Sequence, residues 1–441
     1  MLIVLYFIFM LIIGGRAYKQ IKNHKDFFIA GKRGSVLEIT GSLLATILGS
    51  STIIGSVDFA YDVGWAGAWL LLAAILGLIL LYPFLEYLEK FQNYNLSELL
   101  GNIYGKEVKL LASFIIPIAW LGIIASQIIG AAKIVMILSS LEYIEAVIIS
   151  GGIFIIYTFL GGQLSIIKTD FIQLGFIIFG IGLTYLYINS GVNDMESLGL
   201  INEKFNFLDV LVLILTYSTT FLVGPDIYSR LFCAKDIKVM KTSLIMTIII
   251  LIPLAFILSW LGIYGKTVFT QTEFGLKSIL LLIAENKLPK EIQIFLYFGL
   301  LSAVISSADT TLLTASSLLT QCFLKDLKNK KAIKLTRFMI IFLGVMAICI
   351  SLYLKNILSG LLLATAIYSG AFIIPTIFGV LGYKGESKLV VLGIISGGIL
   401  AFIGKVISGD NGNYIIIMSF ILNIIMLLLG RLFLNKKRVC N

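Results

Sequence analysis

The chain has 441 residues, of which 59% are hydrophobic and only 13% are charged. This composition excludes an ordinary soluble domain and is typical of a protein that crosses a membrane many times. The formal charge of +10 does not indicate a nucleic-acid partner, because cytoplasmic loops of membrane proteins accumulate lysine and arginine. We therefore expect an all-α, polytopic protein embedded in the lipid bilayer.

Apolar segments of about 20 residues, enough to cross a hydrocarbon core of about 30 Å, recur along the chain. They predict about thirteen spans, near residues 1–15, 37–60, 67–88, 110–137, 144–162, 170–190, 208–229, 242–264, 292–323, 338–354, 357–381, 389–407 and 414–434. Most of the 34 Lys and Arg residues fall in alternate loops, which include residues 16–33, 230–241 and 325–337. This asymmetry predicts a multi-pass plasma-membrane protein with its N-terminus outside and its C-terminus in the cytoplasm.

The second predicted span is interrupted by small and polar residues. It reads TGSLLATILGSSTIIGSVDFAYDVGW over residues 40–65, with Gly49, Ser50, Ser51 and Thr52 at its middle. Each hydroxyl alone has an ordinary explanation, because Ser and Thr in membrane helices bond back to their own turn or allow close packing. The run as a whole also fits an unwound segment that lines a ligand site.

The seventh predicted span has a matching interruption. A polar run over residues 217–220 precedes Gly224 and Pro225, and the proline alone explains a kink. Spans two and seven each begin a run of five, 37–190 and 208–381, and the two runs have opposite orientations because five is odd. Transporters built from inverted repeats place unwound helices at such corresponding positions.

The ninth predicted span is rich in hydroxyl groups and reads SAVISSADTTLLTASS over residues 302–317. Carbonyl oxygens freed in the second span, together with the hydroxyls of Ser306 and Ser307, form a neutral oxygen set that suits a dehydrated sodium ion. Asp309 lies one turn beyond Ser306 and needs a partner at this depth. We expect a structural or gating role for Asp309 rather than direct ligation.

Four motifs in order resemble the sodium/solute symporter family, namely DFFIAGKR (26–33), YTFLGGQLSIIKTDFIQ (157–173), DIYSRLFCAKD (226–236) and SAVISSADTTLLTASS (302–317). The resemblance implies a LeuT-type fold with two inverted five-helix repeats, 37–190 and 208–381. One extra N-terminal helix, 1–15, precedes them, and two C-terminal helices, 389–434, follow. It also implies sodium-coupled uptake of a small polar solute, with Na+ as the coupling ion and no other cofactor.

The resemblance carries individual residues with it. It implies a sodium site made by the carbonyls of Ala45, Leu48 and Ala303 and the hydroxyls of Ser306 and Ser307. It implies a solute site that contains Gly49, Ser51, Thr52, Gln127, Tyr217, Thr220 and Phe221. Lys133 is a further candidate, either for a solute carboxylate or as a side chain that snorkels to the interface.

Asp170 matches the family aspartate near the sodium pathway. Asp170 followed by Gln173 also fits a capping box at the start of a helix, and the two interpretations are compatible. Family members usually have Trp before this Thr-Asp pair, whereas this chain has Lys168, a cation that weighs against a sodium role for Asp170.

Other functions remain open at this point. A proton-coupled carrier on the same fold would use Asp170 or Asp309, and a membrane sensor would bind the solute without transporting it. An enzyme is not expected, because the only histidine is His24 in a basic loop and no catalytic constellation is evident. The solute class, whether amino acid, sugar or carboxylate, is not determined by the sequence.

Overall fold

The computed structural model describes residues 12, 24–90, 95–139, 141–189, 198–270, 278–324, 327, 330–354, 356–407 and 409–439. Throughout these ranges the regular structure is helical, and β pairing is limited to two isolated bridges, Gly34 with Ala234 and Asn202 with Phe205. The all-α prediction is confirmed. The predicted span 1–15 lies outside the described residues, apart from Ile12.

The first part of the chain contains one interrupted span. Its helices are α2 (His24–Ile29), α3 (Val36–Ile47), α4 (Ser50–Val63), α5 (Trp69–Leu81), α6 (Leu85–Lys90), α7 (Leu96–Tyr104), α8 (Lys106–Leu138), α9 (Tyr143–Leu160) and α10 (Gln163–Asn189). Short 3₁₀ turns, η1 (Ala30–Lys32), η2 (Gly64–Ala68) and η3 (Tyr82–Phe84), connect some of them.

The second part contains another interrupted span. Its elements are α11 (Phe207–Leu213), the π-helical turn η4 (Ile214–Ser218), α12 (Thr219–Val223), α13 (Pro225–Leu231), α14 (Ile237–Val268), α15 (Ile279–Lys287), α16 (Lys290–Phe323), α17 (Lys330–Tyr353), α18 (Ile357–Val380), α19 (Ser387–Ile407) and α20 (Gly409–Val439).

Within the described ranges, 11 helical segments are long and apolar enough to cross a membrane. Helix α3, with 12 residues, is too short to cross a membrane alone. Its span continues beyond the break as α4. The predicted total of about thirteen spans stays a prediction. One predicted boundary is wrong in a way that matters: α10 begins at Gln163 instead of residue 170, so Asp170 lies inside the helix and does not cap it.

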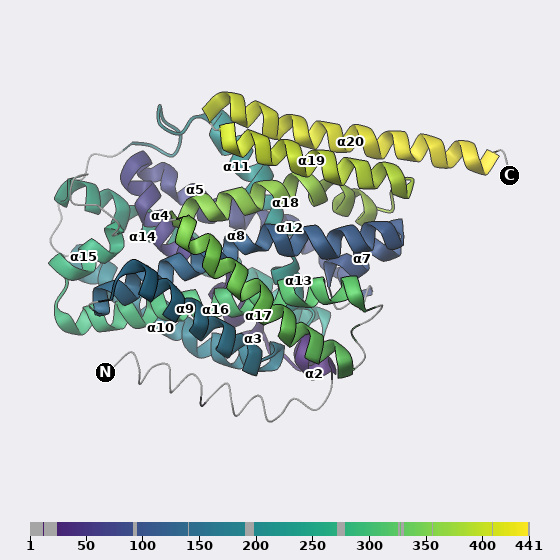
Figure 1. Cartoon of the computed structure of the whole chain (residues 1–441). Coiled ribbons are helices and arrows are strands. Elements are labelled where there is room, and N and C mark those ends of the chain that lie inside the picture. Colours follow the sequence, from purple (N-terminus) through teal and green to yellow (C-terminus); the bar gives the residue numbers. More distant parts are fainter. Residues whose placement is uncertain are drawn as a thin grey trace.

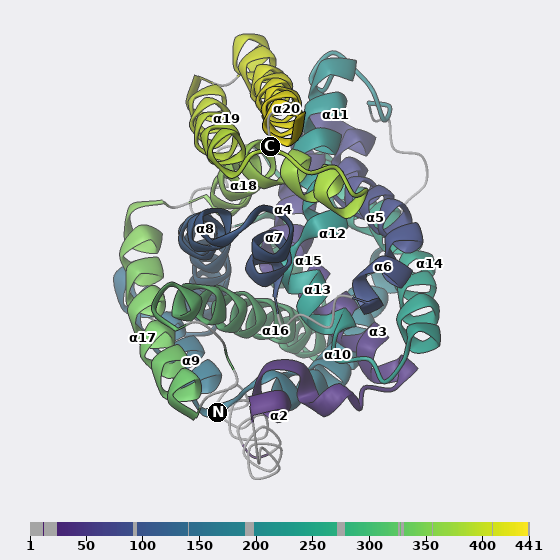
Figure 2. The same cartoon turned by 90° about the vertical axis from the view of Figure 1, so that its right-hand side faces the viewer.

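Helix α16 lies inside the bundle, bordered by α17, α9 and α10, whereas α19 and α20 pack as a pair along one side (Figures 1 and 2). Every residue from Gly299 to Gln321 of α16 is buried. Buried hydroxyls must find acceptors, and many in α16 bond back to their own helix. Thr310 Oγ1 donates to the carbonyl of Ser306 at 2.6 Å, and Thr311 Oγ1 donates to that of Ser307 at 2.6 Å.

The break between α3 and α4 lies at Leu48 and Gly49. Helix α3 begins with a capping box between Ser35 and Glu38 and ends where Gly49 adopts an extended conformation, φ −75° and ψ 179°. A Cβ atom on Gly49 would lie only 2.6 Å from Ser307 Oγ. Any larger residue here would displace the side chains of α16 and α8, and the predicted interruption of the second span is present.

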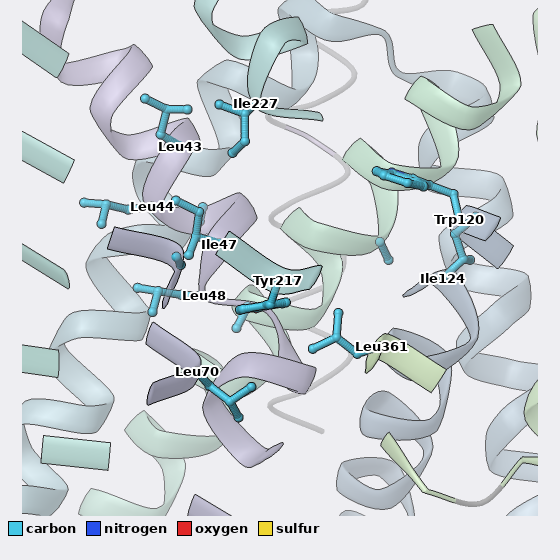
Figure 3. Packing of buried hydrophobic residues seen from close by; sticks show 14 of the residues in the cluster. Leu43, Leu44, Ile47, Leu48, Leu70, Trp120, Ile124, Tyr217, Ile227 and Leu361 are labelled. Carbon is cyan, nitrogen blue, oxygen red and sulfur yellow. The ribbon is translucent and has the colours of Figure 1, made fainter. Parts of the chain in front are cut away.

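The break between α12 and α13 lies at Gly224 and Pro225. Proline disfavours a helical conformation in the residue before it and suits the first turn of a helix, and Gly224 is extended with ψ 130°. A Cβ atom on Gly224 would lie 2.1 Å from the Thr220 carbonyl oxygen. This second predicted interruption is also present, and both breaks lie inside the apolar core, where Tyr217 is drawn between Leu48 and Leu361 (Figure 3).

Candidate functional site

The two adjacent serines of α16 bridge to the end of α3. Ser306 Oγ donates to the Ala45 carbonyl at 2.9 Å, and Ser307 Oγ lies 3.1 Å from the same oxygen and 2.9 Å from the Thr46 carbonyl oxygen. These carbonyls are available because the last four carbonyls of a helix have no partner in the following turn. The break thus supplies acceptors that α16 alone does not have.

The structure brings the predicted sodium ligands together. Ser306 Oγ also lies 3.1 Å from the Ala303 carbonyl oxygen, so four of the five predicted groups are connected by hydrogen bonds. The fifth residue, Leu48, closes α3 through its N–H to the Leu44 carbonyl at 2.8 Å. All five residues are buried.

Gln127 of α8 holds the start of α4. In a continuous helix the Ser50 N–H would donate to Thr46, but here it donates to Gln127 Oε1 at 2.9 Å. The Ser50 hydroxyl lies 2.8 Å from the same oxygen, and Gln127 Nε2 donates to Ser51 Oγ at 3.0 Å. The Gln127 amide therefore replaces the missing helical bond and stabilises the break.

Asp170 and Arg230 form a buried ion pair beside the serines. Arg230 Nη2 lies 3.4 Å from Asp170 Oδ2, and both side chains are completely buried. Ser42 Oγ donates to the same carboxylate oxygen at 2.5 Å, and Arg230 Nε donates to Thr46 Oγ1 at 3.2 Å. The pair thereby joins α10, α13 and the inner face of α3.

Asp309 belongs to the same charged cluster. It is buried on α16, and the charges of Asp170 and Arg230 both act on it. Its Oδ1 lies 3.4 Å from Thr310 Oγ1, whose hydroxyl donates to the Ser306 carbonyl. The counter-charge in this region is Arg230, one residue that sequence reasoning missed. The loop count had placed Arg230 in the cytoplasmic segment 230–241, and this assignment is wrong because Arg230 is fully buried.

A cavity lies between the two breaks and holds about 550 Å³ of empty space, part of which is open to solvent. All seven predicted solute residues line it: Gly49, Ser51, Thr52, Gln127, Tyr217, Thr220 and Phe221. The Thr52 and Tyr217 hydroxyls lie 3.4 Å apart, and the rings of Tyr217 and Phe221 pack edge to face with centroids 5.0 Å apart. Ser307 also lines the cavity, so the cavity and the serine bridge share a wall. Lys133 is not among the lining residues.

Two residues of the cavity wall that sequence reasoning missed, Trp120 and Asp226, are bonded to each other. Trp120 of α8 donates its indole N–H to Asp226 Oδ2 of α13 at 2.8 Å, and both residues face the cavity. Asp226 opens the motif DIYSRLFCAKD, and its position directly after Gly224 and Pro225 was the available signal. The sequence alone gave no reason to pair it with Trp120.

Comparisons with known proteins agree with this geometry. Residues 27–397 match the model of the sodium:solute symporter family. A sodium/proline symporter of Haemophilus influenzae is 24% identical over 449 residues, covering 91% of this chain and 87% of the relative. A solved sodium-coupled sialic acid symporter superimposes with a TM-score of 0.78 at 18% identity, covering 97% and 95% of the two chains. Mhp1, a nucleobase-cation symporter, superimposes with a TM-score of 0.65 at 12% identity, covering 93% and 94%.

The fold, with its two broken helices, is of the LeuT type. The chain belongs to the sodium:solute symporter family. It is therefore a multi-pass membrane transporter that couples solute movement to Na+, and it is not an enzyme.

Proposed function

We propose that Na+ binds between α3 and α16, to the carbonyls of Ala45, Leu48 and Ala303 and the hydroxyls of Ser306 and Ser307. The observation that carries this proposal is the pair of serine hydroxyls bonded across to the open end of α3, at 2.9 and 3.1 Å from the Ala45 carbonyl oxygen. Hard cations prefer oxygen ligands. A serine hydroxyl that now donates to a carbonyl turns its lone pair toward an arriving ion, and the carbonyl then ligates the same ion.

Sodium binding of this kind couples to conformation because its ligands come from two separate elements. A ligand shifts an equilibrium only by its different affinity for the two states. Na+ stabilises the arrangement in which α3 and α16 are in contact, and it is released when they separate. The Asp170 and Arg230 pair attaches α13 and α3 to α10, and we assign Asp170 a role along the pathway of the ion.

The solute occupies the cavity between the breaks. Its lining mixes hydroxyls with aromatic rings, which suits a small polar organic molecule. The five-helix repeats fall at 37–190 and 208–381, so the breaks occupy the first span of each, as inverted-repeat transporters require. With the N-terminus outside in the plasma membrane, Na+ enters the cell with the solute. The membrane potential adds about 2.3 kcal/mol of driving force per charge for each 100 mV.

Uptake into proteoliposomes tests this function. The full chain is reconstituted, L-proline is the first labelled probe because a relative is named for it, and other amino acids, sugars and carboxylates follow. We expect accumulation when Na+ is imposed outside and none when K+ replaces it. Uptake that is equal with and without the sodium gradient would contradict the proposal.

Proton coupling on the same fold remains the second candidate, because Asp170 and Asp309 are both buried near the serines. The same vesicles distinguish the two. A pH gradient in sodium-free medium drives uptake only if a proton replaces Na+ as the coupling ion.

A further inference from the structure

One carboxylate in the solute cavity has no cation of its own. Asp226 is the single ionisable residue among Asp, Glu, Lys, Arg and His that lines the cavity, within the part of the chain that the structure describes. Its Oδ2 accepts the Trp120 indole N–H at 2.8 Å. Its Oδ1 is buried and receives no hydrogen bond from the described residues, although Thr314 lies close enough to stabilise the carboxylate.

The positive charge that acts on Asp226, that of Arg230, is shared with another carboxylate. Arg230 lies one helical turn after Asp226 on α13, but its guanidinium pairs with Asp170 at 3.4 Å and its Nε donates to Thr46. A single guanidinium thus faces more than one carboxylate. A carboxylate held at the edge of a cavity without an ion pair attracts a cationic group.

The remaining walls suit the same ligand. Trp120, Tyr217 and Phe221 all face the cavity, and aromatic faces attract ammonium groups. The described lining offers no Lys, Arg or His to neutralise a solute that carries only a negative charge. A plain carboxylate would therefore meet repulsion from Asp226.

We propose that Asp226 is the anchor for a positively charged nitrogen and that the transported solute carries an ammonium group. This inference rests on the proposed function and narrows its solute from any small polar molecule to amino acids and other amines. Trp120 acts as a positioning residue, because its N–H fixes one oxygen of the carboxylate at the cavity wall.

The proposal is tested with matched probes on the purified full chain in sodium. Thermal stabilisation is measured with the standard amino acids and choline, and with partners that lack the charged nitrogen: the corresponding 2-hydroxy acids, cyclopentanecarboxylate as the partner of L-proline, and simple sugars. We expect stabilisation by one or more ammonium compounds and by none of their matched partners. Binding of a sugar or a nitrogen-free carboxylate, or binding of no ammonium probe, would overturn the proposal.

Variants then assign the effect to Asp226. Asp226→Asn is expected to weaken binding of the ammonium probe about 10- to 100-fold, because a hydrogen bond to a charged group is lost. Asp226→Glu restores part of the affinity, and Trp120→Phe causes a smaller loss. Asp410→Asn, an exposed position on α20, is the matched control. Unchanged affinity in a folded Asp226→Asn protein would contradict the assignment.

Failure of this inference and failure of sodium coupling are distinguishable. A sugar that accumulates along a sodium gradient leaves the proposed function intact and removes the ammonium anchor. An ammonium compound that binds through Asp226, but whose uptake ignores the sodium gradient, keeps the anchor and removes the coupling.

Discussion

The two broken helices satisfy their open ends by different means. At the first break, serine hydroxyls from α16 reach the Ala45 and Thr46 carbonyls. At the second, tyrosine hydroxyls donate to the open carbonyls. Tyr368 donates to the Val223 carbonyl at 2.6 Å, and Tyr228 donates to the Leu222 carbonyl at 3.0 Å.

The difference supports the proposal that the first break binds an exchangeable ion and that the second break is a fixed joint. A serine hydroxyl rotates freely and both donates and accepts, so it can release a carbonyl to an ion and ligate the same ion. A phenol at the end of a buried ring has no such freedom, and the Tyr368 ring also packs against Trp120 with centroids 4.6 Å apart. We infer that the first break binds Na+ and that the second holds the shape of the solute cavity.

The largest expected effect comes from Arg230. It lies on α13, after the second break, and donates to Thr46 of α3, just before the first break. Arg230→Met leaves Asp170 buried without its counter-charge and is expected to lower the free energy of unfolding by about 3–5 kcal/mol. Chemical unfolding of the purified protein in detergent measures this. The double variant Arg230→Met with Asp170→Asn should recover part of the loss, and equal losses in the single and double variants would show that the pair is not coupled.

Tyr368→Phe tests the fixed joint. It leaves the buried Val223 carbonyl without its donor and is expected to cost about 1–3 kcal/mol of unfolding free energy. The sodium concentration for half-maximal uptake should stay unchanged, because the first break is intact. A large shift in sodium dependence in this variant would mean that the two breaks do not have separate roles.

Gly49→Ala tests the exchangeable site. The new Cβ would lie 2.6 Å from Ser307 Oγ and 2.9 Å from the Gln127 amide, and both side chains must shift. We expect the sodium concentration for half-maximal uptake to rise about 10-fold, which corresponds to about 1.4 kcal/mol. An unchanged sodium dependence would separate Ser307 from the ion.

Pro225→Ala should have the smallest effect. The proline occupies the first position of α13, where its missing N–H costs nothing and where alanine adopts the same conformation. The expected loss is about 0.4–1 kcal/mol of unfolding free energy, through greater freedom of the unfolded chain. Solute and sodium affinities should match those of the unaltered protein, and a large change in either would give the proline a direct role in the site.

Much of this architecture could be predicted from the sequence because the signals were local. The break at Gly49 follows from a glycine and hydroxyl run in an apolar span, and the break at Gly224 follows from the adjacent proline. The family motifs, together with these runs, identified the residues that line the cavity. Such patterns specify local backbone behaviour, and an inverted repeat converts two local breaks into one site.

The charged cluster could not be predicted in the same way. Arg230 follows a span in the sequence, so charge counting placed it in a cytoplasmic loop, whereas α13 continues the span and buries it. Asp170 suggested a helix start, but α10 begins at Gln163. The partners Ser42, Asp170 and Arg230 lie on three helices, and no local pattern reports which buried charges meet across a bundle.

Equilibrium binding of radioactive sodium to the purified full chain tests the central claim most directly. The test variant replaces Ser306 and Ser307 by alanine, and the matched control replaces Ser316 and Ser317, an adjacent buried serine pair of the same helix in which Ser317 bonds to its own helix at Thr314. The account predicts sodium affinity about 100-fold weaker in the first variant, since two ligands to a charged ion are lost, and unchanged affinity in the second. Equal sodium affinity in the test variant and the unaltered protein would contradict it.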